Sequence, residues 1–455
     1  MAHPLDVEAL RAQVAALMPR ALDDLAALVA MPSVADERIV PRAECDRAAE
    51  WVAAAFRAEG IADARPELTP DGSSTVVGYG PGPPGAPTVL LYSHFDVQPP
   101  LRDDAWTSPP FTLTERDGRL YGRGAADSKG NIVAHLTALR ALRALAGDDL
   151  PVGVRLAIEG SEEQGAGGLD ELVVARPELF AADVVLIADA GNIALGVPTL
   201  TVALRGAADL VVHVETMTGV LHSGQFGGAA PDALAALIAL LAGLRDERGE
   251  LTVPGIDTAG TWPGAGYDEA QFVADAGVLP GVELIGTGSV ADRLWARPTL
   301  TVLGIDAPPV VGSTAAIQPR ASARLNLRIP PGMDGDAARD ALADHLRAAA
   351  PWGAHVTVET SPVGAAFAAR TDTPAFALLS DALADAYGRP TVSAGMGGSI
   401  PLCSVLARAL PEASIVLLGV EEPASAIHAP NESVHPDEIE RLALGMALFA
   451  SRLAQ

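Results

Sequence analysis

Short apolar runs alternate with a helical pattern through the first half of the chain. Buried strands are predicted over Pro87–Tyr92, Val152–Ile158 and Val184–Ala188, because each run is short and almost wholly apolar. Between the first two runs, apolar positions recur at helical spacing over Ile132–Leu145. This alternation is typical of an α/β layer with a buried sheet. The pattern therefore predicts a central, mostly parallel sheet flanked by helices.

A different order of elements begins near Gly206. Strand, helix, strand, strand, helix and strand are predicted in turn over Ala208–Val214, Pro231–Arg245, Thr299–Leu303, Ala321–Ile329, Asp336–Ala349 and His355–Glu359. This βαββαβ order is the split unit of a ferredoxin-like domain. The segment 251–292 is rich in Gly and Pro and has no predicted structure.

The first pattern returns near residue 371. Its elements are a helix over Ala375–Ala386, a strand over Ile415–Leu418 and a terminal helix over Pro436–Leu453. We therefore expect one α/β domain, made of residues 1–205 and 371–455, that is interrupted by an inserted ferredoxin-like domain of residues 206–370.

Composition and charge narrow the class of protein. The chain has 455 residues, 49% of them hydrophobic, which is enough for more than one domain. Lys and Arg total 31 against 57 Asp and Glu, and the net charge of -26 makes nucleic acid or an anionic membrane an unexpected partner. Residues 1–20 are expected to form an amphipathic helix and not a signal peptide, and no run is long enough to span a bilayer. Cys45 and Cys403 alone cannot build a disulfide framework, which favours a cytoplasmic location.

Polar residues of chemical interest follow the predicted strands, where open α/β sheets place their ligand sites. His94 and Asp96 come directly after the first strand. Residues two apart on an extended segment project to the same side, so the Asp96 carboxylate is placed to orient the imidazole of a metal-binding His94. Taken alone, a His-x-Asp pair is better explained by a turn with a satisfied histidine.

Acidic residues occupy the next loops. Asp127 ends a Gly-rich loop before a helix, where its two carboxylate oxygens could bridge two cations, although taken alone it is better explained as a helix cap. Glu162 and Glu163 follow a strand and are followed by Gly165; on a turn, one can ligate metal while the other accepts a proton from water. Asp189 ends another strand, and His428 lies in a loop before the last helix.

Taken together, these residues make a stronger case than each does alone. Two histidines and several carboxylates form an N/O ligand set that suits zinc, with manganese or cobalt as substitutes. Converging acidic groups would repel one another without bound cations. The sequence therefore predicts a metal site at the strand ends.

The chain resembles the metallopeptidase family that contains aminoacylase, carboxypeptidase G, succinyl-diaminopimelate desuccinylase and the carnosinase-type dipeptidases, and it is most similar to the dipeptidase branch. The resemblance rests on motifs that occur in order along nearly the whole chain: SHFDVQP from Ser93, YGRGAADSKG from Tyr121, EGSEEQG from Glu159, ADAG from Ala188, LHSGQFGG from Leu221, GGSIP from Gly397 and HAPNE from His428.

The resemblance implies two Zn²⁺ per subunit. One is held by His94, Asp127 and Asp189, and the other by Asp127, Glu163 and His428. Glu162 is implied as the general base and Asp96 as a second catalytic acid, and the peptide bond after Asp127 is implied to be cis.

The remaining matches concern the substrate. The inserted domain is implied to serve as a lid and as the dimerisation domain of a homodimer. His222 is implied to reach the active site of the partner subunit and to stabilise the oxyanion. Arg328 is implied to bind the substrate carboxylate, together with Gly398 and Ser399. Without the resemblance, His222 is a loop histidine and Arg328 a surface ion-pair partner.

These features favour an exopeptidase that hydrolyses dipeptides or short peptides with a free C-terminal carboxylate. Two alternatives stay open. An N-acyl-amino-acid amidohydrolase would use the same site on another amide next to a carboxylate. A catalytically silent relative would bind peptide or metal only, although such proteins usually lack the base or a ligand.

Overall fold

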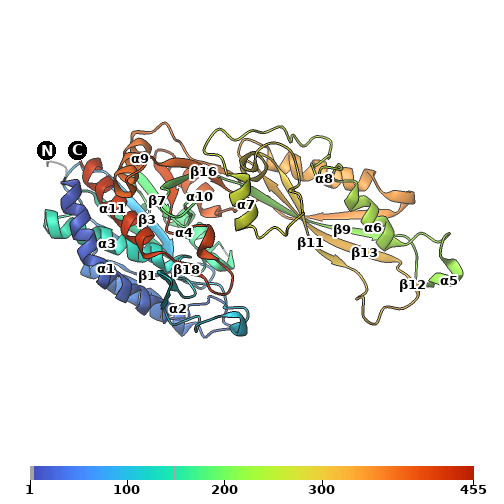
Figure 1. Cartoon of the computed structure of the whole chain (residues 1–455), viewed down its shortest axis with the longest axis horizontal. Coiled ribbons are helices and arrows are strands. Elements are labelled where there is room, and N and C mark those ends of the chain that lie inside the picture. Colours follow the sequence, from blue (N-terminus) through green and yellow to red (C-terminus); the bar gives the residue numbers. More distant parts are fainter. Residues whose placement is uncertain (1–4, 148, 166) are drawn as a thin grey trace. The chain divides into compact units, whose positions relative to one another are not determined.

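The structure is a computed structural model that describes residues 5–147, 149–165 and 167–455. Its residues form two compact units (Figure 1). The first consists of residues 1–202, 369–394 and 401–455, and the second of residues 203–368 and 395–400. The second unit therefore lies within the sequence of the first, and it includes a short segment, 395–400, that is distant in sequence from its main part.

A nine-stranded mixed sheet is the scaffold of the first unit, with the order β1-β2-β6-β3-β7-β17-β8-β15 and β16 beside β8. Its strands are β1 (Arg65–Leu68), β2 (Ser74–Gly80), β3 (Thr88–His94), β6 (Gly153–Glu159), β7 (Val184–Ala188), β8 (Thr199–Leu204), β15 (Phe367–Ala368), β16 (Val392–Met396) and β17 (Ser414–Leu418). Strands β6, β3, β7 and β17 run parallel at the centre. A small sheet contains β4 (Thr114–Arg116), β5 (Arg119–Tyr121) and β18 (Ser433–Val434).

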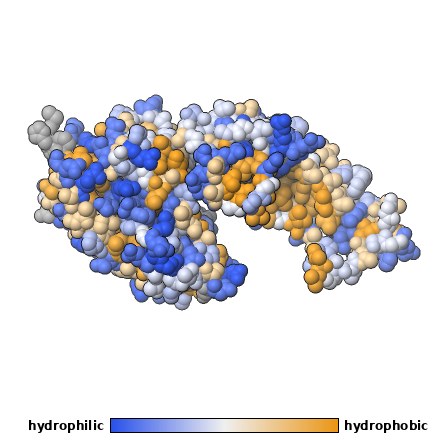
Figure 2. All heavy atoms as spheres, viewed as in Figure 1, coloured by the Kyte–Doolittle hydropathy of each residue, from blue (hydrophilic) through white to orange (hydrophobic). Residues whose placement is uncertain are grey.

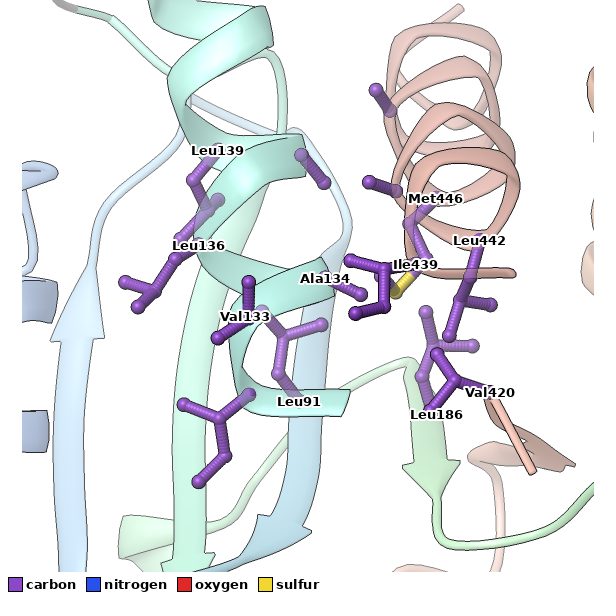
Figure 3. Packing of buried hydrophobic residues seen from close by; sticks show 14 of the residues in the cluster. Leu91, Val133, Ala134, Leu136, Leu139, Leu186, Val420, Ile439, Leu442 and Met446 are labelled. Carbon is purple, nitrogen blue, oxygen red and sulfur yellow. The ribbon is translucent and has the colours of Figure 1, made fainter. Parts of the chain in front are cut away.

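Helices pack on this sheet through apolar faces. They are α1 (Val7–Val29), α2 (Ala43–Ala58), α3 (Lys129–Ala146), α4 (Gly168–Ala175), α9 (Pro374–Tyr387), α10 (Pro401–Ala409) and α11 (Pro436–Leu453). Figure 3 shows α3 beside α11, with Ala134 pointing toward Ile439. The sequence also fixes the helix ends, because Asp6 and Thr373 cap α1 and α9 with their side chains.

The second unit contains a four-stranded antiparallel sheet in the order β11-β13-β9-β14. Its strands are β9 (Gly206–Glu215), β11 (Thr299–Asp306), β13 (Arg320–Ile329) and β14 (His355–Thr360), and its main helices are α6 (Ala233–Ala242) and α8 (Gly335–Ala348). One sheet face alternates buried apolar residues such as Leu210, Val212 and Leu325, which join a core with both helices. The order of elements is the predicted βαββαβ.

The structure adds detail where the sequence patterns were weak. Helix α3 begins at Lys129 and not at Ile132, because the polar first turn is buried and carries no apolar signal. Within segment 251–292, Leu251, Val253 and Ile256 join the core of the second unit, and α7 covers Glu269–Asp275. Strand β10 (Leu221–His222) directly precedes the short helix α5 (Ser223–Phe226) and pairs antiparallel with β12 (Ala316–Ile317), which comes much later in the chain. Within the described part of the chain, no helix is long and apolar enough to cross a membrane.

Candidate functional site

The predicted polar residues lie at the carboxyl ends of the parallel strands. His94 is the last residue of β3, Glu162 and Glu163 follow β6, and Asp189 follows β7. Parallel neighbours end at the same edge of the sheet, so these side chains are brought together. Asp127 precedes α3 and His428 lies between β17 and β18.

The first group of potential ligands consists of His94, Asp127 and Asp189, whose ligand atoms all lie within 4.8 Å of one another. His94 Nε2 is 2.9 Å from Asp127 Oδ1 and 3.0 Å from Asp189 Oδ1. The His94 side chain is completely buried. These three residues face one point in the protein interior.

The second group consists of Asp127, Glu163 and His428. His428 Nε2 lies 3.0 Å from Asp127 Oδ2 and 3.2 Å from Glu163 Oε2. The two oxygens of Asp127 therefore face the two histidines separately, and Asp127 is common to both groups. The helix-cap explanation of Asp127 is wrong, because the N-cap residue of α3 is Ser128.

The charges of the two groups are strongly coupled. Burial alone would lower the pKa of His94, but Asp189 and Asp127 raise that pKa well above its usual value. Hydrogen bonds to Asp127 and Glu163 raise the pKa of His428 to about 10. Burial would raise the pKa of Asp127, but the two histidines lower it. The cluster thus needs positive charge among its carboxylates.

The geometry at His94 fits a metal ion as the source of that charge. His94 Nδ1 lies 3.0 Å from the carbonyl oxygen of Asp96, which only accepts hydrogen bonds. The hydrogen of the neutral ring is therefore on Nδ1, and the lone pair of Nε2 faces two carboxylate oxygens. A cation between these atoms removes the repulsion, and an N/O set of this kind suits zinc.

Asp96 contacts both His94 and the neighbouring loop. Its main-chain carbonyl oxygen lies 3.0 Å from His94 Nδ1, and its carboxylate oxygen Oδ1 lies 3.5 Å from the same nitrogen. Together with Asp189 and Asp127, this carboxylate raises the pKa of His94. It also accepts hydrogen bonds from the backbone N–H groups of Glu162 (3.1 Å) and Glu163 (3.0 Å).

The two adjacent glutamates have different surroundings. Gln98 binds Glu163 through its side-chain amide (2.7 Å to Oε2) and its backbone N–H (3.1 Å to Oε1). In the described part of the chain, the Glu162 carboxylate has no hydrogen-bond partner and belongs to neither ligand group. Burial, followed by the charge of Asp189, raises the pKa of Glu162 to about 9 in the metal-free chain. Glu163 is held in place, whereas Glu162 is free to exchange a proton.

Glu432 is a supporting residue to which the sequence patterns assigned no role. Its buried carboxylate accepts hydrogen bonds from the backbone N–H groups of Gly124 (3.0 Å), Ala126 (3.1 Å) and Asp127 (3.1 Å), and it is 2.7 Å from Arg123 Nη1. It lies four positions after His428 in the HAPNE motif. Glu432 therefore joins the loop that carries His428 to the loop that carries Asp127.

A second buried hydrogen-bond network surrounds Ser128, the residue after Asp127. Ser128 Oγ donates to the carbonyl oxygen of Ala188 (3.1 Å), the residue before Asp189. Asn131 Nδ2 donates to Ser128 Oγ (3.1 Å) and to Glu421 Oε1 (2.8 Å). The Asp127–Ser128 peptide bond is cis, as the family resemblance implied.

The other predicted site residues belong to the second unit. His222 is exposed on β10, and in the described residues it makes no hydrogen bond to another candidate. Arg328 on β13 donates to Ser399 Oγ at 3.1 Å. Gly398 has open space where a side chain would be. The structure thus brings Arg328 and Ser399 together within this unit.

Comparisons with known proteins identify the family of the chain. Residues 90–452 match the model of peptidase family M20/M25/M40. Cysteinylglycine-S-conjugate dipeptidase of Corynebacterium striatum is 45% identical over 408 residues, which cover 89% of each chain. Mouse Beta-Ala-His dipeptidase is 30% identical, over 77% of this chain and 74% of that protein. The crystal structure of human carnosine dipeptidase 1 superimposes with a TM-score of 0.81 and 26% identity over the full length of both chains.

The predicted family resemblance and α/β fold are therefore confirmed. The matched region contains the loops of both ligand groups, and the first two relatives each cover more than two thirds of the chain. The chain belongs to peptidase family M20/M25/M40, and it is a metallopeptidase of that family.

Proposed function

We propose that the protein hydrolyses dipeptides or short peptides that have a free C-terminal carboxylate. The observation that carries this proposal is the pair of ligand groups that share Asp127, with the unligated carboxylate of Glu162 beside them. In support, the first two relatives named above are dipeptidases.

Two zinc ions are the proposed cofactors, with manganese or cobalt as substitutes. His94, Asp127 and Asp189 would hold one, and Asp127, Glu163 and His428 the other. When bound, the metals supply Lewis acidity, which lowers the pKa of water and polarises the substrate carbonyl.

The proton transfers are assigned to Glu162. As a carboxylate, it takes a proton from the attacking water, and it returns that proton to the leaving amine. Asp96 supports this residue as a positioning group, because its carboxylate binds the backbone N–H groups of the Glu162–Glu163 turn. Gln98 keeps Glu163 away from the same task by fixing both of its oxygens.

Substrate recognition is assigned to the second unit. Arg328, Gly398 and Ser399 would bind the C-terminal carboxylate, because a guanidinium fork, a hydroxyl and an open glycine suit a planar anion. N-acyl-amino-acid hydrolysis is the second candidate, since such substrates have the same carboxylate.

A substrate panel should separate the two activities. With zinc, manganese or cobalt loaded separately, we expect hydrolysis of Cys-Gly S-conjugates, β-Ala-His or simple α-dipeptides to exceed that of N-acetyl and N-succinyl amino acids by at least about tenfold in kcat/KM. Chromatography of the released free amino acid measures the hydrolysis of peptides and of N-acyl amino acids on one scale. Faster hydrolysis of the acylated amino acids would establish the deacylase instead.

A homodimer formed through the second unit is also proposed. Strand β11 is an edge of its sheet, and Val302, Leu303 and Ile305 on it are exposed. Figure 2 shows hydrophobic side chains on the surface of this unit around β11. Ile238 of α6, a helix that packs on the neighbouring strand β13, is also exposed. An uncovered apolar edge of this kind favours pairing with a second copy of the chain.

In this dimer, His222 would act in the partner's active site as an oxyanion donor. Mixing the inactive variants His222→Ala and Glu162→Gln should then restore about a quarter of the wild-type activity, because random exchange makes half of the dimers mixed and each mixed dimer has one intact site. Steady-state rates after subunit exchange measure this. If His222 acts within its own subunit, the mixture stays inactive, which would contradict the assignment.

A cytoplasmic location is part of the proposal. Cys45 and Cys403 are both free thiols. Burial raises the pKa of Cys45 to about 12 and that of Cys403 well above its usual value, so both stay protonated. Such a chain is suited to a reducing compartment.

A further inference from the structure

A second arginine lies next to Arg328 in the second unit. Arg205 precedes β9, and Ala207 of β9 pairs with Arg328 of β13. Thr299 of β11 pairs with Arg328 from the other side, and it accepts a hydrogen bond from Arg205 Nη1 at 2.9 Å. The two guanidinium groups therefore belong to one cluster, which also contains the hydroxyls of Thr299 and Ser399.

In the described part of the chain, Arg205 has no anionic partner, and Arg328 has only a distant one, Asp209, whose pKa its charge helps to lower without forming an ion pair. Among the described residues, no carboxylate forms an ion pair with Arg205 or Arg328. Arg324, on the same face of β13, differs because it is paired with Asp209. Asp209 also accepts a hydrogen bond from Asn326 at 2.6 Å, so both of its oxygens are occupied.

Because Arg205 is buried, its positive charge without a counter-ion is energetically unfavourable. Arg205 is only 8% exposed, and its Nε is buried without a hydrogen-bond partner. Burial, followed by the charge of Arg328, lowers the pKa of Arg205 to about 10. A buried cation next to a like charge destabilises the unit unless an anion neutralises it.

The neighbouring loop leaves room for such an anion. A Cβ atom at Gly397 would lie 2.8 Å from Arg205 Nη2, so a side chain there would displace the guanidinium. At Gly398, a Cβ atom would meet nothing within 4 Å. The glycines thus let the main chain approach Arg205 while space remains beside Ser399.

We propose that Arg205 and Arg328 form one subsite that binds the single C-terminal carboxylate of the substrate, with Arg205 as a binding residue. This inference rests on the proposed function. The Thr299 and Ser399 hydroxyls orient the two guanidinium groups, and the carboxylate supplies the negative charge that the cluster lacks. Because this anion is unchanged during peptide hydrolysis, the interaction contributes to substrate binding and not to the chemical step.

Replacing Arg205 by Met tests this assignment. For a dipeptide with a free C-terminal carboxylate, we expect KM to rise about 10–100-fold while kcat changes less than about threefold. For the primary amide of the same dipeptide, KM should not change. The melting temperature should stay equal or rise, because an uncompensated buried charge is removed. Arg205→Lys should recover part of the loss, since it keeps the charge but not the fork.

Arg324→Met is the matched control, because it removes an arginine from the same sheet face that is already ion-paired. Its KM for the free acid should equal that of the wild type. An unchanged KM in Arg205→Met would overturn the proposal, as would equal losses for the acid and the amide. A loss confined to dipeptides with C-terminal Asp or Glu would also overturn it, because Arg205 would then bind a second carboxylate.

Calorimetry separates this inference from the proposed function. The probe is a reduced dipeptide, in which CH₂ replaces the scissile carbonyl, used as free acid and as primary amide. If the wild type hydrolyses no dipeptide but binds the acid in an Arg205-dependent way, the proposed function fails and the subsite stands. If dipeptides are hydrolysed but the affinity for the acid is the same in Arg205→Met, only the subsite fails.

Discussion

Replacing Glu162 by Gln is expected to lower kcat by about 10²–10⁴-fold while metal content stays unchanged. The amide cannot take a proton from water. Metal content should persist because Glu162 is absent from both ligand groups, and its backbone N–H bond to Asp96 is kept. Stopped assays at high enzyme concentration measure the residual kcat, and elemental analysis measures the metal content.

Glu162→Asp is the control, since it keeps a carboxylate but draws it back by one methylene. We expect it to retain more activity than the amide. Near-wild-type turnover in Glu162→Gln would exclude Glu162 as the base. Loss of metal together with activity would mean that the residue is a ligand.

Asp127→Asn is expected to have the second largest effect, because Asp127 is the residue that the two ligand groups share. An amide offers one neutral oxygen in place of two anionic ones, so both groups should lose at least about 100-fold in metal affinity. After dialysis, metal content should fall from about two ions per chain toward zero, and activity should fall with it. The backbone N–H bond of residue 127 to Glu432 does not depend on the side chain, so the fold should be preserved.

Asp189→Asn is the matched variant. It changes the group of His94 but leaves Asp127, Glu163 and His428 intact. It should therefore retain about one metal per chain. Equal retention by both variants would contradict the bridging role of Asp127.

The sequence predicted most of the central architecture because its signals are local. The apolar runs around β3, β6 and β7 are interior strands, and the acids that follow them lie at one sheet edge because the strands are parallel. His428 was harder to place from pattern alone, since it lies in a loop and its φ of 61° follows no periodicity. The family motif supplied that residue.

The supporting residues could not be predicted in this way. Gln98 and Glu432 act through hydrogen bonds to the backbone or side chains of other loops, and such bonds depend on tertiary structure. Asp96 lies beside His94 as expected, but its hydrogen bonds to the backbone of Glu162 and Glu163 depend on tertiary structure in the same way. Arg205 lies in no quoted motif, and the missing counter-ion that marks it becomes visible only in three dimensions.

The hydrogen bonds of Glu432 have a consequence for how the enzyme matures during synthesis. Glu432 and Asp127 are 305 residues apart, and a ribosome adds about 5–20 residues per second, so the loop of Asp127 waits about 15–60 s for its partner. The second unit is complete before the C-terminal segment of the first is made, apart from residues 395–400. The nascent chain therefore remains without a finished metal site, and without proteolytic capacity, until translation is almost over.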